Sequence, residues 1–151
     1  SRARKVFPTY GAELAASRLG NEKLERVMDR IESKPETKQL VCECENVTLA
    51  EIQEIAAEPS SHTVSDVRRR TRLGMGTCQG AFCAYRAVGA LDNEEFPWAK
   101  DTTFLFKEFI ESRWKGIRPV LWGNMFRDTE LTRGIYDATL NINGAMINDE
   151  K

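Results

Sequence analysis

The sequence has a single histidine, His62, and no run of apolar residues long enough to cross a membrane. Its longest apolar stretch, residues 104–110, is interrupted by Lys107 and Glu108, whereas a membrane helix needs about 20 consecutive apolar residues. The lack of a second histidine excludes a Rieske-type cluster, and His62 has no recognisable nucleophile near it. We therefore predict no membrane span and assign no residue a catalytic role.

An excess of charge of one sign is also lacking, because 22 lysines and arginines nearly balance 23 aspartates and glutamates. The net charge of -1 gives no general attraction to nucleic acid, so we expect no nucleic-acid partner. Apolar residues make up 41% of the 151 residues, as in ordinary folded domains. Residues 1–5 contain neither a methionine nor an apolar core, and we interpret this start as a cut inside a longer protein.

Apolar periodicity predicts a mainly α protein. Thr48 and Glu51 form a capping-box pattern at one helix start. No alternating pattern predicts a strand. The polar residues 34–39 are interpreted as a linker. Residues 141–151, at the C-terminus, are expected to fray. The helices are expected at about 13–19, 21–33, 48–58, 64–72, 79–91, 101–115 and 129–140.

The same spacing predicts which side chains of the last two helices are buried. Gly74 is expected to end the helix at 64–72, and Gly116 the helix at 101–115. Most of the aromatic residues in this C-terminal part are expected in the core, and the alternative is that some of them pack against a missing domain or a partner subunit. The residues expected to point inward are Phe104, Leu105, Phe109, Ile110, Trp114, Leu131, Ile135 and Tyr136.

The four cysteines form two close pairs that are far apart in the chain. One residue separates Cys42 from Cys44, four separate Cys78 from Cys83, and 33 lie between the pairs. Structural zinc sites usually have spacers of two to four residues, so the one-residue spacer is unusual for zinc. Four thiolates suit a [2Fe–2S] cluster, with one local pair expected on each iron. A disulfide framework is disfavoured, because nothing suggests export.

The residues around the second pair suit a negatively charged cluster. Gly74, Gly76 and Gly80 let backbone amides approach sulfur, and Cys78 is expected at a helix start, which favours negative charge. Four arginines precede this loop, and several interpretations of them remain open. They form a solvated helix face, a source of positive field that raises the reduction potential, a docking site for a redox partner, or a site for nucleic acid or phosphate. They are Arg68, Arg69, Arg70 and Arg72.

Two alternatives to a redox cluster remain open. The cysteines would hold zinc in a module that docks subunits, or they would form disulfides in a scaffold that responds to oxidation. A cluster protein handled in air can lose iron or take up zinc. The metal found in such a sample therefore does not by itself identify the native cofactor. Analysis of iron and acid-labile sulfide after anaerobic purification separates these possibilities.

Two segments carry a resemblance to a known family. Residues 41–48, VCECENVT, and residues 68–83, RRRTRLGMGTCQGAFC, resemble the bacterioferritin-associated ferredoxin type of [2Fe–2S] domain. The plain ferredoxin pattern has two residues inside the second cysteine pair. The four-residue gap here, together with residues 113–123, RWKGIRPVLWG, is similar to the C-terminal part of the large subunits of anaerobic glycerol-3-phosphate dehydrogenases.

This resemblance, which covers about residues 41–140, implies a fold, a ligand set and a larger enzyme. The implied fold has short helices and loops around a four-cysteine site, with N- and C-terminal helices on either side. Cys42, Cys44, Cys78 and Cys83 would bind the cluster. A missing upstream domain would bind FAD and oxidise sn-glycerol 3-phosphate to dihydroxyacetone phosphate. Electrons would pass through membrane-anchoring and iron–sulfur partner subunits to a quinone, at the cytoplasmic side of the membrane. The chain would divide into a lead-in at 1–39, the cluster domain at 40–92 and a helical extension at 93–151.

Overall fold

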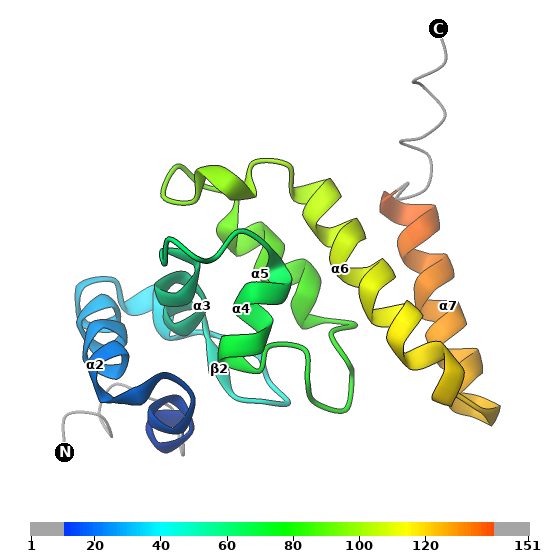
Figure 1. Ribbon diagram of the computed structural model, residues 1–151, viewed down its shortest axis with the longest axis horizontal. Coiled ribbons are helices and arrows are strands. Elements are labelled where there is room, and N and C mark those ends of the chain that lie inside the picture. The colour runs from blue at the N-terminus through cyan, green and yellow to red at the C-terminus, as the bar shows by residue number, and fades with distance from the viewer. Residues whose placement is uncertain (1–10, 141–151) are drawn as a thin grey trace, which may run out of the picture.

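The computed structural model describes residues 11–140, and the chain is mainly α, as the sequence predicts (Figure 1). The fraying predicted for residues 141–151 lies outside the described residues. No helix in the described part is both long and apolar enough to span a membrane. In chain order the elements, with η for 3-10 helices, are α2 (Gly11–Ser33), η1 (Pro35–Lys38), β1 (Leu40–Cys42), β2 (Val47–Thr48), α3 (Leu49–Ala56), α4 (Val64–Thr71), α5 (Cys83–Leu91), η2 (Pro97–Ala99), α6 (Thr102–Ile117), η3 (Arg118–Val120) and α7 (Gly123–Leu140).

The first helical segment, α2, is broken at Gly20, as the sequence predicts. Gly20 has φ 77° and ψ 169°, a conformation that glycine adopts far more readily than other residues. After the break Val27, Met28 and Ile31 turn one buried face toward α3 and α4. This packing holds the N-terminal helix against the elements that carry the cysteines.

A two-stranded antiparallel sheet, β1 with β2, was not predicted. Leu40 pairs with Thr48, and Cys42 pairs with Val47 across an irregular register. The strands have three and two residues, which is too short for an alternating apolar pattern to be visible. The turn between them passes through Asn46, whose φ is 52°. This hairpin fixes the position of the first cysteine pair.

Helices α3 and α4 both begin with a capping box. Glu51 accepts a hydrogen bond from the Thr48 amide at 2.8 Å, and Asp66 accepts one from the Thr63 amide at 3.1 Å. The first of these boxes confirms the sequence prediction. Helix α4 ends earlier than expected, because Arg72 already adopts the left-handed conformation at its C-terminus, with φ 65°, two residues before Gly74.

The core lies between α2, α3, α4, α5 and α6, and it includes the fully buried Ile52, Ile55, Val67, Leu91 and Phe109. The predicted inward residues Leu105, Phe109 and Ile110 are buried, but Phe104 is 59% exposed. Phe106 is buried in its place. Helix α6 also continues through Gly116 to Ile117, since a glycine in a helix is costly but tolerated.

Helix α7 lies beside α6 (Figure 1). It has no buried residue, and Tyr136 and Leu140 pack, partly buried, against the core. Tyr136 packs edge-to-face on Phe106, with ring centroids 5.0 Å apart. The prediction that Leu131 and Ile135 point inward is wrong, because they are 65% and 52% exposed. Val120, Trp122 and Met125, around the start of α7, are exposed as well.

Candidate metal centre

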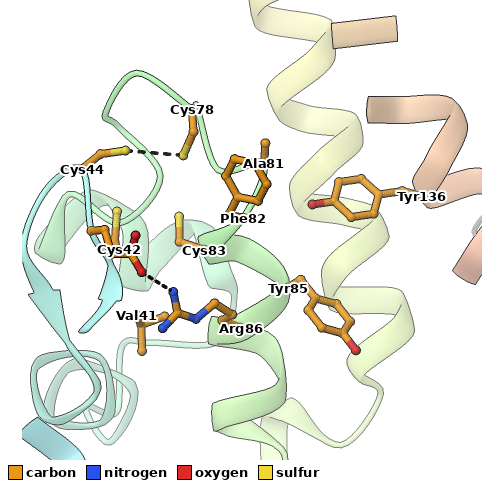
Figure 2. Close-up of a pocket in the computed structure, with 11 residues that line it drawn as sticks. Val41, Cys42, Cys44, Cys78, Ala81, Phe82, Cys83, Tyr85, Arg86 and Tyr136 are labelled. Atoms are coloured by element: carbon orange, nitrogen blue, oxygen red, sulfur yellow. Dashed lines mark hydrogen bonds and ion pairs between the residues drawn. The ribbon is translucent and has the colours of Figure 1, made fainter. Parts of the chain in front are cut away.

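All four cysteines line one cavity of about 550 Å³ (Figure 2). Cys42 comes from β1, and Cys44 from the turn that follows it. Cys78 lies in the loop between α4 and α5, and Cys83 is the first residue of α5. All four thiols are free. The structure therefore brings together two stretches of chain that are distant in the sequence.

The closest sulfur contact that the structure shows joins one stretch to the other. The Sγ atoms of Cys44 and Cys78 lie 3.7 Å apart. Two thiolates on one tetrahedral metal, with bonds of about 2.3 Å, are about 3.8 Å apart. Within residues 11–140, no three histidine, cysteine or acidic side chains form a group that could hold a metal ion as they stand. The sulfurs of Cys44 and Cys78 therefore form one close pair, and no site with three or more ligands is preformed in this part of the chain.

The two sulfur pairs differ in their access to solvent. Cys42 and Cys83, the inner pair, are 1% and 3% exposed. Cys44 is exposed and Cys78 is half-buried, and we call these two the outer pair. One edge of the cavity therefore faces solvent, and the opposite edge is sealed by the core.

The loop between α4 and α5 reaches this geometry through glycines. A Cβ at Gly76 would overlap the Cβ of Cys44, so only glycine lets the loop come this close to the hairpin. Gly80 has φ 92°, and a Cβ there would press on the Phe109 ring. The preceding Gln79 has φ 51°, and its side-chain amide donates to the Gly76 carbonyl at 2.8 Å.

The expectation that Cys78 occupies a helix start is corrected by the structure. Helix α5 begins at Cys83, so Cys83 holds that position. Gln79 and Gly80 both have left-handed backbone conformations, which interrupt the helical spacing that the sequence suggested from residue 79.

Hydrogen-bond donors gather around the sulfurs. Hydrogen bonding with the Cys83 thiol lowers the pKa of Cys42, and the backbone amides of Gly74 and Glu45 add to this effect. The same bond, together with burial, raises the pKa of Cys83. The Thr77 hydroxyl, 3.6 Å from the Cys44 sulfur, is the main cause that lowers the pKa of Cys44. These donors favour the thiolate, which is the form that binds metals.

Arg86 is a cavity residue that the sequence analysis missed. Its guanidinium donates to Glu43 at 3.1 Å and to the Leu40 carbonyl, which ties α5 to the cysteine hairpin (Figure 2). It follows Cys83 by three positions, so helical spacing could have placed it on the same face. Tyr136 of α7, also missed, lines the cavity from the other side.

Most of the arginine run before the loop has local partners. Arg72 pairs with Glu45 at 2.8 Å, and Arg69 pairs with Asp66 at 3.3 Å. Arg70 donates to Ser61 at 2.8 Å. The Arg72 pair connects the end of α4 to the hairpin and so supports the loop that carries Cys78.

The sequence is similar to three subunits of anaerobic glycerol-3-phosphate dehydrogenases. Over 114 residues, 76% of the chain, it is 39% identical to the A subunit of anaerobic glycerol-3-phosphate dehydrogenase from Haemophilus influenzae. It is 42% identical over 99 residues, 66% of the chain, to the protein of the same name from Escherichia coli. It is also 35% identical over 127 residues, 84% of the chain, to the A1 subunit of the Haloferax volcanii enzyme.

The chain spans only 18–20% of the length of these relatives, and no solved structure matches it. Residues 40–93 match the BFD-like [2Fe-2S] binding domain. This range contains all four cysteines, the hairpin and the loop that line the cavity. Residues 40–93 thus belong to the BFD-like [2Fe-2S] binding domain family.

Proposed function

We propose that this chain is an electron-transfer module in which Cys42, Cys44, Cys78 and Cys83 hold one [2Fe–2S] cluster. The observation that carries the proposal is the convergence of four free thiols from two distant segments on one cavity. When bound, such a cluster accepts and releases single electrons. The protein supplies the four sulfurs and backbone amides that hold negative charge on them.

The pairing of sulfurs supports one ligand from each segment on each iron. The 3.7 Å spacing of Cys44 and Cys78 suits two ligands of one tetrahedral metal, which leaves the buried Cys42 and Cys83 for the other iron. This differs from the sequence-based expectation of Cys42 with Cys44 and Cys78 with Cys83. Because the outer pair faces solvent, a redox partner can approach most closely at Cys44 and Cys78.

The larger enzyme is part of the same proposal, and the names of the relatives support it. In it, an FAD-binding domain upstream of this chain oxidises sn-glycerol 3-phosphate to dihydroxyacetone phosphate. Membrane-anchoring and iron–sulfur subunits take the electrons to a quinone, and the complex lies on the cytoplasmic face of the membrane. Within the chain, residues 1–39 lead in from the flavin domain, 40–92 hold the cluster and 93–151 form the helical extension.

Metal analysis of the anaerobically purified chain tests the cluster. We expect two irons and two acid-labile sulfides per chain, with visible absorbance that bleaches on reduction. One zinc per chain without sulfide would instead support the zinc-stabilised docking module. Disulfides that form and break reversibly, without metal, would support the oxidation-responsive scaffold.

A further inference from the structure

Two arginine side chains, Arg68 on α4 and Arg113 on α6, have no partner among residues 11–140. Neither guanidinium takes part in a hydrogen bond or ion pair with that part of the chain, in contrast to Arg69 and Arg72. The Nε atom of each is buried and lacks an acceptor. A buried donor without an acceptor destabilises the fold, and a charged donor does so more strongly. Such a pair of groups suggests that a ligand normally accepts these hydrogen bonds.

The packing of α4 and α6 brings these side chains together. The Phe109 ring of α6 lies against Gly74 and Gly80, in the loop that leaves α4. Arg113 follows Phe109 by four positions, so it lies one turn further along the same face of α6. Burial lowers the pKa of Arg68, and the nearby positive charge of Arg113 lowers it further. Two half-buried arginines on helices that pack together therefore form no ion pair with an acid in the described part of the chain.

We propose that Arg68 and Arg113 form a binding site for a phosphate group between α4 and α6. Each guanidinium presents a fork of donors that matches phosphate oxygens, and two forks from separate helices can hold one tetrahedral anion. A phosphate dianion neutralises both charges, whereas a carboxylate offers one charge and two oxygens. Neither arginine lines the cysteine cavity, so the site is separate from the metal centre.

Thermal unfolding of the 151-residue chain at increasing phosphate concentration tests the proposal. A ligand that binds only the folded state raises the midpoint of unfolding as its concentration rises. We expect inorganic phosphate to do so, and sodium chloride at matched ionic strength and acetate not to do so. A second series with sn-glycerol 3-phosphate distinguishes a site for free phosphate from one that also accepts a monoester. A response to either phosphate compound supports the site.

Variants connect the response to the two arginines. Arg113→Gln and Arg68→Gln should each abolish the phosphate-dependent rise, and Arg69→Gln, an exposed arginine on the same helix, should keep it. Without phosphate, Arg113→Gln should unfold at or above the temperature of the unaltered chain, because it removes a repulsion. The proposal is overturned if phosphate has no effect beyond chloride, if acetate acts equally, or if Arg113→Gln responds as the unaltered chain does.

Discussion

The sulfur atoms of Cys44 and Cys78 lie 3.7 Å apart, although 34 positions separate the two residues in the chain. Their contact depends on hydrogen bonds and ion pairs between the hairpin and the helices around it. Arg86 of α5 bonds Glu43 and the Leu40 carbonyl, and Arg72 at the end of α4 bonds Glu45. The metal centre is therefore a product of tertiary packing, and changes at its ligands and at its supports should have different effects.

Replacement of an outer sulfur should remove the metal and leave the fold. In Cys78→Ser a neutral hydroxyl replaces a thiolate, which is the ligand that iron–sulfur clusters need. We expect the variant to lose most of its iron and acid-labile sulfide, with an unchanged far-ultraviolet circular dichroism spectrum. Thr77→Ser keeps the hydroxyl that faces Cys44 and should retain the cluster. A Cys78→Ser chain with full iron and sulfide would contradict the ligand assignment.

Gly76 should tolerate no side chain. A methyl group there would overlap the Cβ of Cys44, and such overpacking costs about 1 to 3 kcal/mol. We expect Gly76→Ala to lower the free energy of unfolding by this amount and to reduce the iron content. The matched control is Gly89→Ala within α5, where an added methyl group meets nothing within 4 Å. That variant should gain about 0.5 to 1 kcal/mol, and equal behaviour of the two would refute the close approach at Gly76.

The sequence predicted the helical core and the four-cysteine set better than it predicted the connections. The helix predicted at 21–33 has apolar residues at helical spacing from Leu24 to Ile31, and Val27, Met28 and Ile31 of this set are buried. The hairpin at Cys42 is too short to produce a pattern, and the left-handed backbone at Gln79 and Gly80 has no counterpart in apolar spacing. Local signals could not predict these features, because tertiary contacts stabilise them.

The C-terminal helix illustrates a second limit. Spacing identifies an apolar side of α7, but it does not tell whether another element covers that side. Leu131 and Ile135 are exposed, while Tyr136 contacts Phe106. The sequence could not predict the pairing of Arg86 with Glu43 either, because 43 positions separate the two residues and only tertiary packing brings them together.

Arg86 should raise the reduction potential of the bound cluster. Its positive charge at the cavity favours the reduced form, which carries the additional negative charge. Because the side chain is 42% exposed, the interaction is worth a surface value of about 0.2 to 1 kcal/mol, or about 10 to 40 mV for one electron. We expect Arg86→Gln to lower the potential by this amount in a spectroscopic redox titration. Arg133→Gln removes the same charge from α7, away from the cavity lining, and should leave the potential unchanged. Equal potentials in all three proteins would exclude the role of Arg86.

Glu51 should make the stability of the fold depend on pH. Its carboxylate is fully buried, with Thr48 donating to one oxygen and Arg18 standing 3.9 Å from the other. Burial raises the pKa of Glu51 above its ordinary value of 4.5. Between the two values the folded protein binds more protons than the unfolded chain, so the free energy of unfolding falls as pH rises through this window.

Glu51→Gln isolates this effect, because glutamine keeps the capping box but does not titrate. The free energy of unfolding of the unaltered chain, minus that of the variant, should be highest below pH 4.5. It should decrease as pH rises and level off above the raised pKa. Urea denaturation at a series of pH values measures this difference, and the exposed Glu94→Gln provides a control without such a decrease. A difference for Glu51→Gln that stays constant or grows with pH would show that the buried carboxylate is not destabilised by its surroundings.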